Sequence, residues 1–144
     1  MDIYLDIDGT IKGVASPKED VIEFLKYILR HFPDSTYWLT THCNAGYNNV
    51  REALTGELPD KLVDELCKKV KPTEFVVMKT AAINFKRNFV WFDDTLMYVE
   101  RDVLIKNNAE SKHFLMNPKD PESVRAALDY LKMLSLMGNS SVDS

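Results

Sequence analysis

Cysteine is scarce in this sequence, and long hydrophobic runs are missing. Cys43 and Cys67 lie in different segments of the 144 residues, which argues against a disulfide framework and predicts reduced thiols. No apolar stretch approaches the roughly 18 residues of a membrane span, and no basic, apolar leader precedes the first expected strand. A net charge of −4 gives no overall attraction to nucleic acid or anionic membranes. We therefore expect a cytoplasmic protein with no membrane partner, and the charge does not indicate a nucleic-acid partner.

The composition is that of one compact domain. Hydrophobic residues make up 45% of the chain and charged residues 28%, which is ordinary for a protein with a buried core. The sequence contains neither an internal repeat nor a linker that would divide it. We expect a single domain over residues 1–137 and a disordered tail over residues 138–144.

Strands and helices alternate along the chain. Short apolar runs predict strands, and apolar residues at helical spacing predict helices. The expected strands are residues 3–5, 36–40, 75–78 and 89–92, with a last one at Phe114. The expected helices are residues 17–31, 47–54, 59–70, 96–106 and 121–136. This order predicts an α/β fold: a Rossmann-like parallel sheet with helices on both faces and right-handed crossovers.

Two helix starts carry capping signals. Ser16-Pro17-Lys18-Glu19 has the pattern of a capping box with proline at the first helical position, so we expect Ser16 to cap the first helix. Asp120 precedes Pro121 and is expected to cap the last helix.

Four aspartates end two of the expected strands. Asp6 and Asp8 follow the first apolar run, and Asp93 and Asp94 close the run at residues 89–92. The carboxyl ends of parallel strands share one edge of the sheet, where open α/β folds bind ligands. Four acids meeting there would repel one another without a cation. Mg²⁺ suits an all-oxygen site, and Asp6 with Asp93 or Asp94 could hold it beside a substrate phosphate.

The order of four motifs resembles the haloacid dehalogenase (HAD) superfamily of phosphohydrolases. Its first motif matches at Asp6, Asp8, Gly9 and Thr10, its second at residues 37–41, its third at Lys79 and its fourth at Asp93-Asp94. The threonines and the lysine are weak signals singly. The ordered set over residues 2–95 is the specific one, and no catalytic residue is matched beyond it.

The resemblance implies a phosphomonoester hydrolase that uses Mg²⁺. Asp6 would attack phosphorus and form an aspartyl-phosphate, and Asp8 would act as general acid and then base. Thr40 or Thr41 would bind a phosphate oxygen, and Lys79 would offset the negative charge. The metal would be held by Asp6, Asp93 or Asp94 and the backbone carbonyl of Asp8. An acid at position 8 disfavours dehalogenation.

The sequence leaves no room for a cap domain, which HAD enzymes usually insert beside the site. Residues 11–15 alone separate the first motif from the first long helix, and residues 42–78 are accounted for by two helices and a strand. A capless site would admit a macromolecular or carrier-linked phosphorylated substrate. It could also be closed by a second subunit of a homo-oligomer.

Other interpretations stay open. The same aspartyl-phosphate chemistry could serve a phosphotransferase or mutase, or the chain could be a HAD-like domain that only binds phosphoryl groups. A receiver-type switch also uses several Asp, a Thr and a Lys, but there the acidic pair follows the first strand, and here Asp93-Asp94 comes last. An EF-hand loop starting at Asp6 would need Glu where Pro17 stands.

Single residues also have simpler readings. Asp93 to Thr95 could merely cap the next helix, and Lys79 could be a surface lysine. His42 and Cys43 lack further metal-ligating neighbours in sequence and are interpreted as loop residues beside the site. The polar loop at residues 42–51 is the candidate for substrate discrimination, although it could equally be a helix-start loop capped by Asn44.

Overall fold

The protein is a four-stranded parallel sheet with helices on both faces. The computed structural model describes residues 1–46 and 48–140. The strand order is β2-β1-β3-β4, with β1 and β3 in the centre. The strands are β1 (Asp2–Leu5), β2 (Thr36–Trp38), β3 (Phe89–Asp93) and β4 (His113–Leu115). This confirms the predicted α/β, Rossmann-like parallel sheet.

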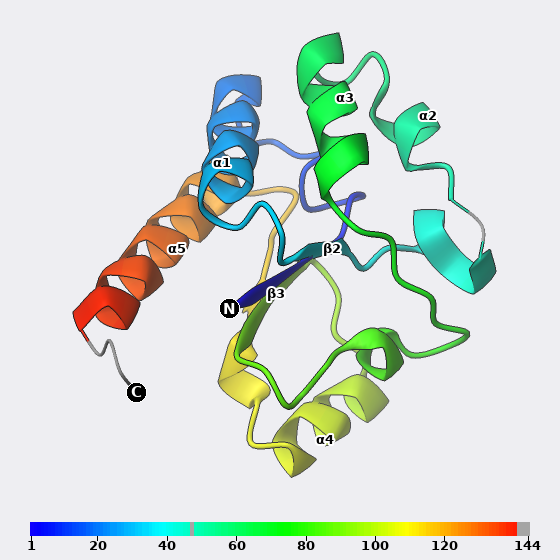
Figure 1. The fold of residues 1–144 in the computed structure, drawn as a ribbon, viewed down its shortest axis with the longest axis vertical. Coiled ribbons are helices and arrows are strands. Elements are labelled where there is room, and N and C mark those ends of the chain that lie inside the picture. The colour runs from blue at the N-terminus through cyan, green and yellow to red at the C-terminus, as the bar shows by residue number, and fades with distance from the viewer. Residues whose placement is uncertain (47, 141–144) are drawn as a thin grey trace.

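Helices connect the strands. The α-helices are α1 (Lys18–His31), α2 (Val50–Leu54), α3 (Asp60–Lys69), α4 (Tyr98–Lys106) and α5 (Ser123–Ser140). The 3₁₀ turns are η1 (Thr41–Gly46), η2 (Lys79–Ala82) and η3 (Glu110–Lys112). Helices α1, α3 and α5 lie on one side of the sheet and α4 on the other (Figure 1).

The central strands are buried on both faces, so their side chains divide between two cores. Ile3 and Leu5 of β1 belong to the core beneath α1, α3 and α5, whereas Tyr4 belongs to the core on the α4 side. Phe92 and Trp91 of β3 divide in the same way. Alternate residues of a strand point to opposite faces, and the apolar character of all of them is what a sheet covered on both sides requires.

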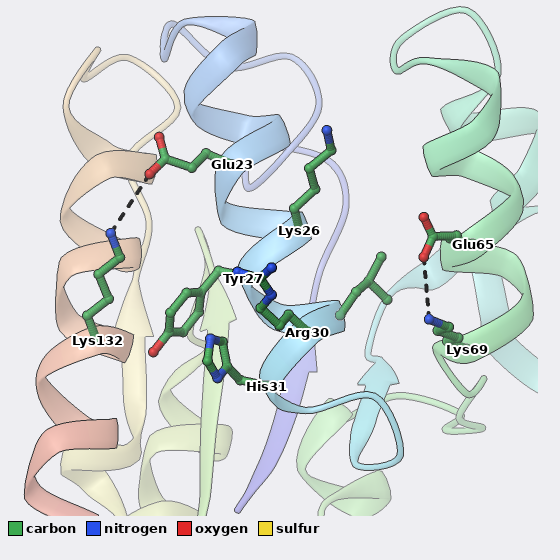
Figure 2. Close-up of a pocket in the computed structure, with 9 residues that line it drawn as sticks. Glu23, Lys26, Tyr27, Arg30, His31, Glu65, Lys69 and Lys132 are labelled. Carbon is green, nitrogen blue, oxygen red and sulfur yellow. Dashed lines mark hydrogen bonds and ion pairs between the residues drawn. The ribbon is translucent and has the colours of Figure 1, made fainter.

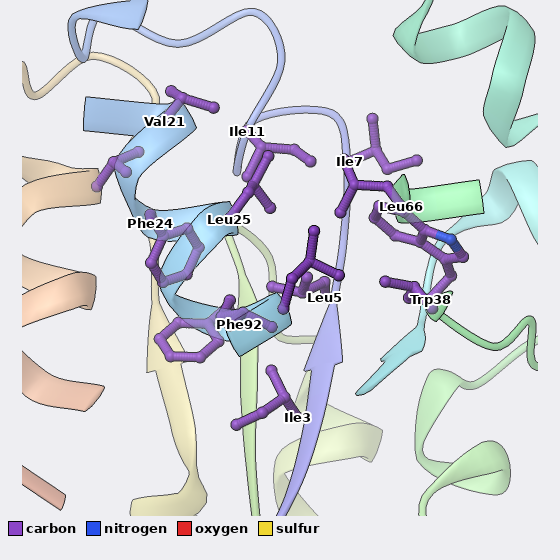
Figure 3. Close-up of a cluster of buried hydrophobic side chains, with 14 of the residues drawn as sticks. Ile3, Leu5, Ile7, Ile11, Val21, Phe24, Leu25, Trp38, Leu66 and Phe92 are labelled. Atoms are coloured by element: carbon purple, nitrogen blue, oxygen red, sulfur yellow. The ribbon is translucent and has the colours of Figure 1, made fainter. Parts of the chain in front are cut away.

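Helix α1 shows how the larger core is closed. Its outer face carries Glu23, Lys26 and Arg30 beside a groove that α3 and Lys132 of α5 also border (Figure 2). Its inner face packs Phe24 and Leu25, among others, against the sheet, where Phe24 meets Phe92 edge to face at 5.2 Å (Figure 3). Burial of this apolar face fixes α1 against β1 and β3.

The strand predicted at residues 75–78 is wrong. The chain pairs with β2 earlier, through a single bridge between Lys71 and Tyr37, and Pro72 then follows without a backbone N–H to continue the ladder. The Thr73 hydroxyl donates to the Trp38 carbonyl at 2.6 Å. The apolar run beyond it is irregular, and Val76 and Val77 are exposed.

The capping box predicted at Ser16 is also wrong. No side chain caps α1, because the Ser16 hydroxyl oxygen instead accepts a hydrogen bond from the backbone N–H of Val124 at 3.1 Å. Helices α1 and α5 pack together, so Ser16 serves the start of the neighbouring helix. Asp120 accepts from the backbone N–H of Glu122 at 2.9 Å, in the turn before α5 begins at Ser123, so the predicted cap of the helix by Asp120 is not confirmed.

Several helix ends differ from the expected ones. Helix α5 continues to Ser140, beyond the predicted end at residue 136, so residues 138–140 of the expected tail are helical, and residues 141–144 lie outside the described residues. Helix α2 begins at Val50, not near Tyr47, which is itself not described. Within the described chain, no helix combines the length and hydrophobicity needed to cross a membrane.

Candidate metal centre

Neighbouring strands bring the first and fourth motifs together. Leu5 of β1 stands opposite Phe92 of β3, and the Asp6 N–H donates to the Phe92 carbonyl at 3.1 Å. The next residues on each strand, Asp6 and Asp93, therefore leave the same edge of the sheet. One oxygen from each of Asp6, Asp93 and Asp94 lies within 4.8 Å of the others. We call these three residues the acidic cluster.

A single lysine faces the acidic cluster. Lys79 Nζ lies 2.6 Å from Asp93 Oδ2 and 3.4 Å from Asp6 Oδ1. Its position is set by η2, where the Lys79 N–H donates to Glu100 Oε2 at 2.9 Å. Glu100 is itself buried and also accepts from the Met97 N–H at 3.1 Å. Helix α4 thus fixes the lysine through a buried carboxylate, and the isolated sequence lysine becomes part of the site.

The acidic cluster has more negative charge than its lysine can balance. Burial, with the neighbouring charge of Asp6, raises the pKa of Asp93 from 3.8 to about 8, although Lys79 opposes this. Burial alone would lower the pKa of Lys79, but the carboxylates of Asp6 and Asp93 outweigh it and raise the pKa. The lysine therefore stays charged, and the surplus falls on the acids, which must hold a proton or share a cation.

Gly9 joins the first motif to the fourth. It adopts a left-handed backbone conformation with φ of 78°, which glycine tolerates and most residues do not. A Cβ placed on Gly9 would collide with the Asp94 carboxylate. The glycine is therefore required both by the turn and by the close approach of Asp94.

Asp8 stands apart from the acidic cluster. Its side chain is 63% exposed, and its Oδ2 lies 2.8 Å from Nε2 of His42. The other ring nitrogen, Nδ1, lies 2.8 Å from Asn49 Oδ1. His42, interpreted from sequence as a loop residue beside the site, thus positions the Asp8 carboxyl group. In the sequence, His42 stands two residues after Thr40 of the second motif, which places it near the site. No local pattern linked it to Asp8.

The two threonines of the second motif occupy different positions. Thr40 is buried, and its Oγ1 accepts from the His42 N–H at 3.3 Å. Thr41 is exposed and lines the cavity of the acidic cluster. Thr41 is thus the threonine of the pair that lines the cavity with Asp6, and Thr40 shapes the turn that carries His42.

The acidic cluster opens into a cavity of about 250 Å³. It is lined by polar and apolar residues from several segments: Asp6, Thr41, Phe75, Val77, Lys79, Asp93, Thr95, Met97 and Glu100. Sequence reasoning missed Phe75, Val77, Met97 and Glu100, because apolar residues in a short run and an acid in a helix carry no local sign of a site.

The polar loop at residues 42–51 contributes less than expected. Arg51 Nη1 is bound to Asp64 Oδ1 of α3 at 2.6 Å, so it is engaged away from the acidic cluster. The side chains of residues 44–47, including Asn44, lie outside the described residues. Within the described part of the loop, His42 and Asn49 are the residues that connect to a motif aspartate.

The residues present fit a hard divalent cation. The acidic cluster offers only carboxylate oxygens, lies at a buried strand edge, and has an uncompensated negative charge. Mg²⁺ needs one or two carboxylates and completes its shell with water and phosphate oxygens. None of the residues that line the cavity is a cysteine, and burial raises the pKa of the Cys43 thiol, so the cavity lining holds no thiolate that would favour a softer metal.

Comparison with models of protein families finds no match, and neither do comparisons with curated proteins and with solved structures. The fold and the site define a class without a family: a small α/β domain with a four-stranded parallel sheet and a buried cluster of acids that could hold a metal.

Proposed function

We propose that the protein is a Mg²⁺-dependent phosphomonoester hydrolase of the HAD type, working through an aspartyl-phosphate on Asp6. The observation that carries this proposal is the acidic cluster with one lysine. Asp6 Oδ1 lies 3.4 Å from Lys79 Nζ, with the carboxylates of Asp93 and Asp94 close by. The residues proposed as nucleophile, cation and metal-binding pair therefore lie together at one edge of the sheet.

The residues divide the work of two displacements. In the first, an Asp6 oxygen bonds to phosphorus as the bond to the alcohol oxygen breaks, and Asp8 gives its proton to that leaving oxygen. In the second, water attacks phosphorus, Asp8 takes the water's proton, and the bond between phosphorus and Asp6 breaks to release phosphate. Bound Mg²⁺ would supply positive charge against the phosphoryl oxygens. Lys79 supplies the same from the protein.

Two observations support the separate role of Asp8. Its carboxyl group lies outside the acidic cluster, so it is free of the carboxylates that surround Asp6. His42 and Asn49 hold it through a chain of two 2.8 Å contacts. A positioned carboxyl group that does not ligate the metal through its side chain is suited to move protons.

The proposal is tested by hydrolysis of p-nitrophenyl phosphate with Mg²⁺, Mn²⁺, Ca²⁺ or EDTA. We expect turnover with Mg²⁺ and Mn²⁺, and inhibition by Ca²⁺, which takes a larger and more flexible shell. A crystal grown with beryllofluoride, a mimic of the phosphoryl group, should carry BeF₃⁻ on Asp6 only when Mg²⁺ is present. Full turnover in EDTA, or an adduct on another aspartate, would refute the proposal.

A further inference from the structure

An apolar wall borders the acidic cluster. Phe75, Val77 and Met97 line the same cavity as Asp6 and Lys79. Phe75 is buried, whereas Val77 and Met97 are exposed. The cavity therefore has a charged floor suited to a phosphoryl group and apolar sides.

A second cavity continues this wall. It is open to solvent, has a volume of about 510 Å³, and is lined by Phe75, Val76, Val77, Met78, Ala81 and one charged residue, Glu74. Phe75 and Val77 line both cavities, so the cavity of the acidic cluster borders directly on the apolar one. We call this second cavity the apolar cavity, and its volume is in the range of small-molecule sites.

The exposure of these valines has a physical cost. Val76 and Val77 are 82% and 74% exposed, although a valine is more stable when its side chain is removed from water. Val76 and Val77 are exposed because the run at residues 75–78 does not join the sheet. Exposed apolar surface beside a polar site is characteristic of ligand-binding grooves.

We propose that the apolar cavity binds the alcohol part of a small phosphomonoester, and that this part is apolar, with an aromatic ring or a short alkyl chain. This assignment rests on the proposed function, because it places the substrate's phosphoryl group on the acidic cluster. The bond that breaks then lies where the charged floor meets the apolar wall.

The lining of the apolar cavity argues against other substrates. Among the residues that line it, none is cationic, so a second phosphate or a carboxylate on the substrate would lack a partner and would face Glu74. Apart from Glu74, those residues have no polar side chain for the hydroxyls of a sugar. Polar groups that lose water without gaining a partner weaken binding.

Inert phosphonates test the proposal without interference from leaving-group reactivity. Methyl-, n-propyl-, n-pentyl- and phenylphosphonate, with orthophosphate as reference, would be titrated into the Mg²⁺-loaded protein by calorimetry. We expect Kd to fall by up to about fourfold for each methylene buried, since each contributes about 0.8 kcal/mol, and phenylphosphonate to bind more tightly than methylphosphonate.

A matched pair of variants locates the effect. Val76→Asn should raise the Kd of phenyl- and pentylphosphonate by about tenfold, the scale expected for losing burial of one apolar side chain. It should leave the Kd of orthophosphate nearly unchanged, because Val76 lines the apolar cavity and not the cavity of the acidic cluster. Val99→Asn is the control, because Val99 is also exposed, at 53%, but lines neither cavity.

Three results would overturn the proposal: affinity independent of chain length, equal effects of Val76→Asn and Val99→Asn, or tighter binding of a phosphoserine peptide than of phenylphosphonate. The proposed function fails separately. If orthophosphate does not bind and no ester is hydrolysed in an Asp6-dependent way, the hydrolase assignment is wrong. If both occur without a preference for apolar groups, only the apolar cavity is misassigned.

Discussion

Two groups of carboxylates in this protein differ in their burial and in how fully nearby cations balance their charge. On the outer side of the α1–α5 pair, Arg125 Nη2 lies 2.7 Å from Asp20 and 2.8 Å from Glu23, and Lys132 approaches Glu23 at 3.8 Å (Figure 2). At the carboxyl edge of the sheet, Lys79 is the one cationic partner that the described residues offer to the acidic cluster. The first group is balanced and partly exposed to water, and the second is buried with surplus charge.

The difference separates acids that cost the fold little from acids whose burial is costly. Exposed ion pairs contribute little to stability, because water already solvates both partners. A buried surplus of negative charge is costly, and a fold keeps it only where something else relieves the cost. The acidic cluster is therefore the place to expect chemistry, and the acids near Arg125 are the natural controls for it.

The largest contrast should appear when one acid is neutralised in each group. Asp6→Asn removes the nucleophile and one metal ligand together, so hydrolysis of p-nitrophenyl phosphate should be abolished. Glu23→Gln, in the surface group, should leave turnover at the wild-type level. Steady-state kinetics with circular dichroism as a check of folding would measure both. Measurable Mg²⁺-dependent turnover by a folded Asp6→Asn protein would remove Asp6 from the nucleophilic role.

The next prediction distinguishes Asp8, which lies outside the acidic cluster, from the residues of that cluster. Asp8→Asn should slow turnover by about 10²–10⁴-fold, the range of a positioned general acid and base, and should change Mg²⁺ affinity far less. Asp93→Asn should instead weaken Mg²⁺ binding. Calorimetric titration with Mg²⁺ measures the metal affinity of each variant and so distinguishes the two roles. Loss of Mg²⁺ binding in Asp8→Asn with retention in Asp93→Asn and Asp94→Asn would contradict this division.

The two groups should also respond to pH in opposite directions. In the metal-free protein, the pKa of Asp93 is raised from 3.8 to about 8, so between these values the folded state holds a proton that the unfolded state has released. Stability therefore falls as pH rises from about 4 to 8, by a few kcal/mol at most. Chemical denaturation across this range should show the slope, and Asp93→Asn should flatten it.

For the surface group of carboxylates, stability should change with pH in the opposite direction. The hydrogen bond from Arg125 lowers the pKa of Glu23 below its ordinary value of 4.5, so its stabilisation is present above that pH and lost as pH falls through the lowered pKa. Glu23→Gln should therefore leave the slope between pH 5 and 8 unchanged. If Asp93→Asn also left that slope unchanged, the buried charge would not be the cause of it.

The smallest effect is expected from the surface pairs themselves. Arg125→Ala removes the contacts to both Asp20 and Glu23, yet it should lower the free energy of unfolding by no more than about 1 kcal/mol, and less at high salt. Denaturant melts at two ionic strengths measure this. A loss of several kcal/mol that persists in high salt would mean that the α1–α5 ion pairs are structural after all.

The parallel sheet could be predicted because its signals are local. A strand buried on both faces reads as a continuous apolar run, as at Phe89 to Phe92, and an amphipathic helix such as α1 shows its period in the sequence. The apolar run at residues 75–78 gave the same signal and is not a strand. Its pairing partner was already engaged at Lys71, and Pro72 ended the ladder, which no count of apolar residues could reveal.

The sequence by itself determined which groups could do chemistry at this site: four aspartates, two threonines and a lysine placed at or between strand ends. Only the tertiary structure decided their positions. It placed Asp6, Asp93 and Asp94 near Lys79 and Asp8 beside His42. It also placed the Ser16 hydroxyl at the start of α5 instead of α1, and an apolar wall beside the acids. Capping and apolar patterns are set by near neighbours, whereas these contacts join residues tens of positions apart, whose meeting depends on how the helices pack against the sheet.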